Sequence, residues 1–388
     1  KACEAYFSRP LPRDGKTMLF VFHPGKPVAF SQVNPFLFYA DEIRTQFDLH
    51  VRAVAATRLS ACGIRNADLV CVQTDFDISE AELDALFSQV RQDHPTAKIV
   101  YFDWFAPLDL RLAQRLDPHI DLYVKRQVFA DLQKYAQSTI GDTNLMDHYC
   151  RRFQLQAPEQ SFPVPDGFFE KLILGAGLFT GDYLLRAFQN NDFHTQKKSI
   201  DLHARLGCKG TPWYTAMRNE AVEACRNLHG LEIRQGGGIN KQQYFVELAQ
   251  SKLCFSPFGY GEVCWRDFEA IHAGALLLKP DMSHLRTEPD IYQDGETYVS
   301  VAWDYSDLQE KADFYARDGQ ERRRIVDNAQ QVMRDYTNNL RFLQQMKPLF
   351  ELAHGRSFRI PAPSPPKLAS IGLVKITAAD RLKTQADR

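Results

Sequence analysis

The stretch "SKLCFSPFGYGEVCWRDFEAIHAGALLLKP", residues 251–280, joins two apolar runs through a glycine turn and a helical pattern. Short apolar runs at 251–258 and 275–280 are typical of buried strands, and 264–274 has the spacing of a helix. Gly-Tyr-Gly then lies between a strand and a helix, where glycine lets the backbone approach a ligand and a helix N-terminus favours an anion. This arrangement favours a binding site at the end of a sheet.

Arg266 and Glu269 lie one turn apart at the start of this helix. An arginine can form paired hydrogen bonds with a phosphate, and a glutamate can accept hydrogen bonds from vicinal hydroxyls. Phosphate and ribose together indicate a nucleotide. The alternative is that Arg266 and Glu269 pair with each other on a solvated face beside a plain turn.

The same alternation of strand and helix patterns occurs on both sides of this stretch. Strands are predicted at 17–23, 50–56, 67–75, 97–105, 120–127, 198–206, 231–237, 251–259, 275–280 and 297–303. Helices are predicted at 79–92, 213–227, 240–250, 264–274, 306–316 and 319–337. Apolar strands separated by helices indicate parallel sheets covered on both faces. We therefore expect an α/β protein with two Rossmann-like domains in series, whose ligands bind in a cleft at the carboxyl ends of the strands.

The length of 388 residues fits two domains. We expect an N-terminal domain at 1–165, a C-terminal domain at 166–340, and a C-terminal helix and proline-rich tail at 341–388. The tail contains "GRSFRIPAPSPPK", which is typical of an extended linker and fits a larger multidomain parent. The chain begins at Lys1 rather than Met, as expected if an upstream segment had been removed.

The composition excludes several classes of partner. The chain has 47 basic and 48 acidic side chains, so no overall field attracts nucleic acid. No apolar run reaches the roughly 18 residues of a membrane span, and residues 1–20 lack a signal-peptide core. The eight cysteines form no Cys-x-x-Cys pair, so we expect neither a metal site nor disulfides, and a cytoplasmic location.

The glycine turn and the helix after it resemble the donor-binding signature of GT-B glycosyltransferases, in the spacing of the exostosin-like branch and of family 1-like donor domains. The matching positions are Gly259, Tyr260, Gly261, Arg266, Glu269, Ala270, Gly274 and the "ALLLKP" strand. The resemblance continues through residues 290–337. Retaining members of this class carry a glutamate eight residues before the second one, but position 261 here is Gly, which leaves the stereochemical outcome open.

The resemblance implies that the C-terminal domain binds a nucleotide sugar and the N-terminal domain an acceptor, without a metal and with no cofactor other than the sugar donor. Donor contacts are expected from Gly259, Tyr260, Gly261, Glu262, Arg266 and Glu269. In similar enzymes basic residues after the strand at 198–206, here Arg205 and Lys209, hold the diphosphate; a solvated loop is the alternative. The expected acceptor is a glycan or lipid-linked glycan of bacterial surface polysaccharide synthesis, and a lipid-linked acceptor would place the protein peripherally at a membrane.

Three residues at predicted strand ends are candidate catalytic bases. His23 follows the first strand, and a histidine with its ordinary pKa near 6.5 can take a proton from an acceptor hydroxyl. Asp75 and Asp103 are rival bases, and each of the three has a structural role as its alternative. The single Asp-x-Asp at 75–77 is too common a pattern to indicate a metal site.

Aromatic residues flank Asp103. Phe102, Trp104 and Phe105 are candidates for a sugar-stacking wall, although core packing is the expectation for at least two of them. The "RQGGGIN" segment at 234–240 lacks the spacing of a dinucleotide fingerprint and is expected to turn near the nucleobase.

Two other functions fit the same fold. A nucleotide-sugar epimerase would act without an acceptor, and a non-catalytic scaffold would bind the nucleotide without turnover.

Overall fold

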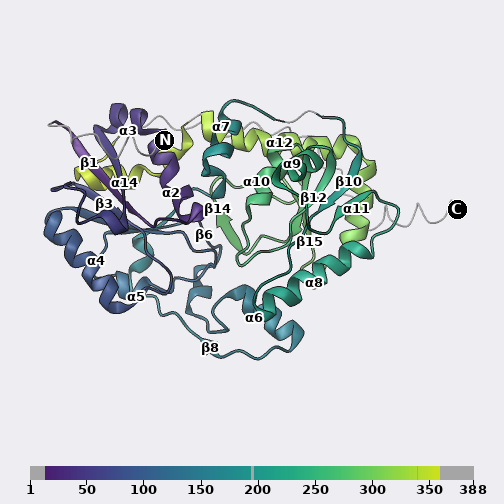
Figure 1. The fold of residues 1–388 in the computed structure, drawn as a ribbon, viewed down its shortest axis with the longest axis horizontal. Helices are drawn as coiled ribbons and strands as arrows, with labels where there is room; N and C mark the ends of the chain where they lie inside the picture. The colour runs from purple at the N-terminus through teal and green to yellow at the C-terminus, as the bar shows by residue number, and fades with distance from the viewer. Residues whose placement is uncertain (1–13, 194–195, 339, 359–388) are drawn as a thin grey trace.

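In the computed structural model, which describes residues 14–193, 196–338 and 340–358, two α/β domains lie side by side (Figure 1). Each is built on one parallel sheet, as the alternation of strand and helix patterns predicted. The predicted strands and helices all occur, within a few residues of the expected bounds. The fold class is therefore confirmed.

The N-terminal sheet has six parallel strands in the order β2-β1-β3-β4-β5-β9. They are β1 (Lys16–Phe22), β2 (Leu49–Ala55), β3 (Leu69–Val72), β4 (Lys98–Asp103), β5 (Leu122–Lys125) and β9 (Leu172–Leu174). The helices that accompany them are α2 (Pro27–Phe38), α3 (Ala40–Phe47), α4 (Glu80–Asp93) and α5 (Ala113–Leu116). β3 is buried at every position, because a parallel sheet is covered on both faces. α4 begins with a capping box between Ser79 and Glu82, a signal visible in the sequence.

The C-terminal sheet has five parallel strands in the order β11-β10-β12-β13-β15. They are β10 (Ile200–Ala204), β11 (Ile233–Gln235), β12 (Ser251–Phe255), β13 (Leu276–Pro280) and β15 (Val299–Val301). The helices of this domain are α8 (Pro212–Arg226), α9 (Lys241–Ala249), α10 (Trp265–His272), α11 (Leu308–Arg317) and α12 (Gly319–Asn338). The glycine turn of residues 259–261 follows β12 and precedes α10, at the carboxyl edge of this sheet.

Several segments tie the two domains together. β6 (Gln127–Phe129) pairs antiparallel with β14 (Leu285–Thr287), which joins the two halves of the chain in one small sheet. α6 (Asn144–Phe153), which lies between the hairpin strands β7 (Thr139–Ile140) and β8 (Glu159–Gln160), packs on α8 of the other domain (Figure 1). The domains are therefore held by backbone pairing as well as by side chains.

The chain returns to the N-terminal domain at its end. After α7 (Asp182–Gln189) and the second domain, α13 (Arg341–Gln345) and α14 (Lys347–His354) follow α12. α14 contacts β1 and β4, and the Phe350 ring lies 4.4 Å from Phe47 and 6.4 Å from Phe36, measured between centroids. β9, although it lies beyond residue 165, belongs to the N-terminal sheet. The division at 165/166 remains a prediction, and most of the proline-rich tail lies outside the described residues.

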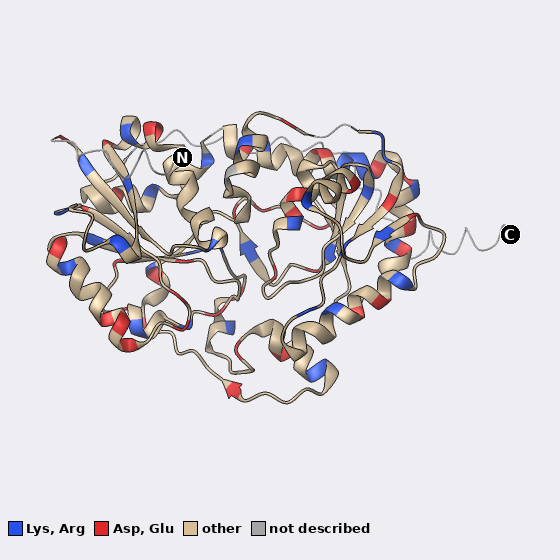
Figure 2. Ribbon diagram, viewed as in Figure 1, with Lys and Arg blue, Asp and Glu red and all other residues tan. Residues whose placement is uncertain are grey.

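Charged residues of both signs are distributed over both domains (Figure 2). This distribution agrees with the balanced composition. None of the helices in the described ranges combines the length and apolarity that crossing a bilayer requires.

Candidate active site between the two sheets

The carboxyl edges of both sheets border one cavity. Its lining includes Phe76 after β3, Trp104 after β4, Trp213 at the start of α8 and Tyr260 in the glycine turn after β12. The cavity has a volume of about 780 Å³. It is the large space between the domains, and we call it the interdomain cavity.

Arg266 and Glu269 both contact Tyr244 of α9 and do not pair with each other. The Glu269 carboxylate accepts hydrogen bonds from Tyr183 Oη (2.8 Å) and Tyr244 Oη (2.9 Å), and Arg266 Nε donates to Tyr244 Oη at 3.4 Å. Arg266 Nη2 donates to the carbonyl oxygen of Arg205. None of the ion pairs among the described residues joins Arg266 to Glu269. The alternative, in which these two side chains pair with each other on a solvated face, is therefore not observed.

Both side chains keep hydrogen-bonding capacity. An ionised carboxylate has about four acceptor positions and a guanidinium has five N–H groups. Tyr183 and Tyr244 use two of the positions on Glu269, and Tyr244 and Arg205 use two N–H groups of Arg266. The bonds to Tyr183, Tyr244 and the Arg205 carbonyl therefore do not use all the hydrogen-bonding groups of these two side chains.

The two basic residues after β10 lie in different surroundings. Arg205 forms a bidentate pair with Glu247, at 2.9 Å for each bond, and also donates to the Gln235 carbonyl. These contacts tie the loop after β10 to the end of β11. Lys209 is exposed at the surface of the same loop. Of the two, Lys209 is the cation that an incoming anion can reach directly.

Tyr260 covers the start of α8. Its ring stacks on Tyr214 with centroids 4.4 Å apart, and its hydroxyl accepts from Thr211 N at 3.0 Å. The ring is nevertheless 44% exposed. Gly259 precedes it within the connection between β12 and α10, and its amide donates to the Gly261 carbonyl.

Gly261 and Glu262 contact the other half of the chain. A Cβ at Gly261 would lie 2.2 Å from the Ala106 carbonyl oxygen, so only glycine fits where the turn meets the loop after β4. Glu262 is buried, accepts from Asn144 Nδ2 at 2.7 Å and lies 3.5 Å from His284 Nε2. In this structure these two signature residues hold segments together.

His23 and Asp75 form a pair at the carboxyl edge of the N-terminal sheet. They follow β1 and β3, which are neighbours in the sheet, and His23 Nε2 lies 2.8 Å from Asp75 Oδ2. Nδ1 of His23 is buried and has no hydrogen-bond partner among the described residues. The sequence presented these two residues as rival bases, whereas the structure brings them together as one histidine–carboxylate pair.

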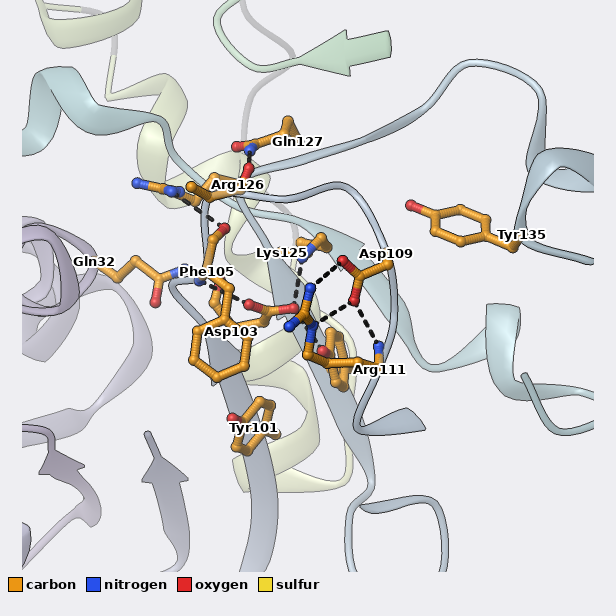
Figure 3. Close-up of polar contacts among 12 residues, drawn as sticks. Gln32, Tyr101, Asp103, Phe105, Asp109, Arg111, Lys125, Arg126, Gln127 and Tyr135 are labelled. Atoms are coloured by element: carbon orange, nitrogen blue, oxygen red, sulfur yellow. Dashed lines mark hydrogen bonds and ion pairs between the residues drawn. The ribbon is translucent and has the colours of Figure 1, made fainter. Parts of the chain in front are cut away.

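Asp103 lies in a buried ion pair (Figure 3). Its carboxylate accepts from Lys125 Nζ and Tyr123 Oη, both at 2.6 Å, and from Phe105 N at 2.8 Å. Asp103 and Lys125 are each 1% exposed. Because three hydrogen bonds engage its carboxylate and solvent does not reach it, Asp103 fixes the ends of β4 and β5.

The aromatics around Asp103 divide between core and cavity. Phe102 packs in the core against Phe20 and Phe36, whereas Trp104 and Phe105 line the interdomain cavity. In the described part of the chain no three His, Cys, Asp or Glu side chains are grouped so that they could hold a metal ion.

Several residues of this site carried no signal in the sequence. Tyr183, Tyr244 and Glu247 contact the predicted donor residues from helices that are distant in the chain. His203 Nε2, on β10, lies 3.8 Å from the Glu247 carboxylate. In the sequence His203 is indistinguishable from the other residues of a buried strand. Only the three-dimensional packing of α7 on α10 and of α9 on β10 and β12 identifies them.

His203 makes the stability of the C-terminal domain depend on pH. Burial, together with the nearby Arg266, lowers the pKa of His203 to about 4. The unfolded state binds this proton more readily than the folded state, so stability is lost as pH falls from about 6.5 towards 4. With an unfolded pKa near 6.5, the loss at pH 5 is about 2 kcal/mol.

The measurement is urea unfolding of the wild type and His203→Gln at pH 7.5 and pH 5. We expect the wild type to lose about 2 kcal/mol more than the variant between the two pH values. Other buried histidines titrate in both proteins and cancel in the comparison. Equal losses would show that His203 is not held neutral.

Comparison with known proteins agrees with this geometry. A family model described as glycosyl transferase-like matches residues 193–347. An alpha-glucosyltransferase (AGT) solved in complex with UDP superposes with a TM-score of 0.51 at 8% identity, over 87% of this chain and 100% of that one.

A glycosyltransferase from Rickettsia africae ESF-5 gives a TM-score of 0.49 at 10% identity, over 87% and 99% of the two chains. No curated protein sequence matches the chain. At these identities structural likeness establishes the fold and not the activity. Residues 193–347 are therefore similar to a glycosyl transferase-like domain, and the likeness to the alpha-glucosyltransferase shows that the chain as a whole has the GT-B fold.

Proposed function

We propose that this protein transfers a sugar from a nucleotide sugar to a hydroxyl of an acceptor bound in the interdomain cavity. The observation that carries the proposal is the arrangement of Arg266 and Glu269 around Tyr244 at the carboxyl edge of the second sheet. Both keep hydrogen-bonding capacity for a ligand, and they lie in the domain that matches the glycosyl transferase-like model.

In this proposal Glu269 binds the ribose and Arg266 the diphosphate. The acceptor positions left on Glu269 suit the two vicinal hydroxyls of a ribose. Arg266 and the exposed Lys209 supply positive charge for the diphosphate, and the N-terminus of α8 adds its dipole. The "GGG" turn after β11 then lies near the nucleobase.

The leaving group departs with negative charge. Lys209 and Arg266 stabilise it in place of a divalent cation, since preorganised donors act strongly where charge develops. Arg205 contributes by holding the loop after β10 in place and not by its charge, because its guanidinium is paired with Glu247.

His23 acts as the base in this reaction. Nε2–H donates to Asp75, which leaves the Nδ1 lone pair to accept the proton of the acceptor hydroxyl. As this proton transfers, the hydroxyl oxygen bonds to the anomeric carbon, the bond to the diphosphate breaks, and its electron pair leaves with the phosphate. Asp75 stabilises the resulting imidazolium.

The acceptor hydroxyl must reach a nitrogen that is buried in the present structure. The Trp104 ring lies 5.8 Å from the His23 ring between centroids. The proposal therefore includes a shift of Trp104 when the acceptor enters the cavity.

The wider role rests on the resemblance to GT-B enzymes. It suggests a cytoplasmic enzyme that assembles a bacterial surface polysaccharide or a lipid-linked glycan. For the site itself we propose only that the acceptor presents a hydroxyl. The lining of the interdomain cavity is mainly apolar, so it gives no support for a glycan in particular.

A thermal-shift panel tests the donor site. We expect one of UDP, GDP, CMP and dTDP, with its sugars, to raise the melting temperature, since a ligand at 100 times its Kd stabilises the fold by about 2.7 kcal/mol. The shift should persist in excess EDTA. No shift across the panel would contradict the donor site, and a shift lost in EDTA and restored by Mg²⁺ would contradict cation-free binding.

Incubation of the same nucleotide sugar with the protein alone distinguishes a glycosyltransferase from an epimerase and from a non-catalytic scaffold. Formation of an epimer without acceptor would identify an epimerase, whereas binding without turnover under any acceptor would identify a scaffold.

His23→Ala should lower kcat by about 10²- to 10⁴-fold, the usual contribution of a general base, while the nucleotide Kd stays unchanged. Asp75→Asn should lower kcat less, because Asn still orients the ring but does not stabilise the imidazolium. Asp77→Asn is the matched control, as Asp77 is an exposed carboxylate two residues away. Retention of more than half of kcat by His23→Ala would exclude this histidine as the base.

A further inference from the structure

The interdomain cavity has two aromatic walls, one from each domain. Phe76, Trp104 and Phe105 form the wall of the N-terminal domain, and Trp213 and Tyr260 form the wall of the C-terminal domain. Met146 of α6 also lines the space. The volume of about 780 Å³ is within the range of roughly 300–1,000 Å³ typical of small-molecule sites.

The rings present their apolar surface rather than their polar ends. Trp104 Nε1 donates to the Thr74 carbonyl at 2.8 Å, and the Tyr260 hydroxyl accepts from Thr211 N at 3.0 Å. Within the N-terminal wall Trp104 and Phe105 meet edge to face, with centroids 5.2 Å apart. A ligand between the walls therefore meets mainly carbon.

Both walls expose apolar surface to solvent. Phe76 is 52% exposed and Tyr260 is 44% exposed, and both are among the few large apolar side chains exposed on the described residues. Covering such surface is favourable by about 25 cal/mol per Å². An apolar ligand gains this energy, whereas a sugar would bury hydroxyls that need partners of their own.

The charge of the lining disfavours an anion. Arg111 is the only Lys or Arg among the described residues that line the cavity. Its guanidinium makes a bidentate pair with Asp109, with both bonds at 2.8 Å, and also contacts Asp142 at 3.3 Å. One positive charge lies between two negative charges, so the group as a whole is negative. A phosphate would find no unpaired cation in the lining.

We propose that the acceptor is uncharged and presents a flat, apolar ring system next to the hydroxyl that receives the sugar. This inference rests on the proposed function, and it replaces the glycan acceptor suggested by the resemblance with an aromatic alcohol or phenol. The ring lies between Phe76 and Trp104 on one side and Tyr260 and Trp213 on the other. Its hydroxyl points to the end of the cavity where Trp104 adjoins His23.

Binding is tested without any donor. 2-Naphthol is titrated into the protein and followed by quenching of tryptophan fluorescence, with 2-naphthyl phosphate and methyl glucoside as the charged and the sugar probes. We expect saturable binding of 2-naphthol, at least tenfold tighter than binding of either of the other two.

Three variants locate the site. Phe76→Ala removes one ring of the N-terminal wall, and Ala157→Trp places a large side chain in the cavity. Each should weaken 2-naphthol binding at least tenfold. Phe314→Ala, which removes an aromatic of similar exposure on α11, should leave binding within twofold. Ala157→Trp deletes no contact, so it remains informative if Phe76→Ala does not fold.

Turnover completes the test. With the nucleotide sugar chosen by the thermal-shift panel, we expect a naphthyl glycoside as product. Nucleotide binding without 2-naphthol binding would overturn the acceptor class and leave the proposed function standing. Tighter binding of 2-naphthyl phosphate would also overturn it. Binding of 2-naphthol without binding of any nucleotide would overturn the proposed function and the acceptor assignment with it.

Discussion

The buried ion pair of Asp103 and Lys125 fixes the loop on which the site between the domains depends (Figure 3). Asp103 also holds the Phe105 amide, while Arg126 and Gln127 donate to the carbonyls of Phe105 and Ala106 at 3.2 and 2.7 Å. These bonds hold the loop after β4 through its backbone. The rings of Trp104 and Phe105 in this loop can therefore line the interdomain cavity. Breaking a buried pair by removing one partner typically costs 3–5 kcal/mol, so this geometry is strongly enforced.

The glycine turn after β12 meets this loop from the other domain. Gly261 lies against the Ala106 carbonyl, and Glu262 is buried against Asn144. One turn further along, Arg266 and Glu269 surround Tyr244. A single segment thus joins the two domains at one end and carries, at the other, the two residues that we propose bind the nucleotide.

Much of the fold was predictable from local patterns. Apolar runs and capping signals such as Ser79 with Glu82 depend only on neighbours in the chain, so they identified the strands and helices of both sheets. The pairing of β6 with β14 and the return of α14 to the first domain depend on contacts between distant segments, and no local pattern indicates them.

The candidate site was likewise predictable in part. His23 and Asp75 follow strands and Arg266 and Glu269 lie in the helix after β12, positions that the alternation placed at the cleft. Whether a strand-end carboxylate is partly exposed, like Asp75, or buried beside a lysine, like Asp103, depends on the neighbouring strand.

The proposed nucleotide site depends most on one interaction, that of Glu269 with the ribose. Its most direct test is calorimetric titration of the preferred nucleoside diphosphate and its 2′,3′-dideoxy analogue into the wild type and into Glu269→Ala, after circular dichroism has shown that the variant is folded. Hydrogen bonds to a charged group contribute about 1.5–3 kcal/mol, so the wild type should bind the dideoxy analogue roughly 10- to 150-fold more weakly. In Glu269→Ala the two ligands should bind with nearly equal affinity, as expected when the variant removes the partner of the missing hydroxyls. Equal affinity of the two ligands for the wild type would contradict the account.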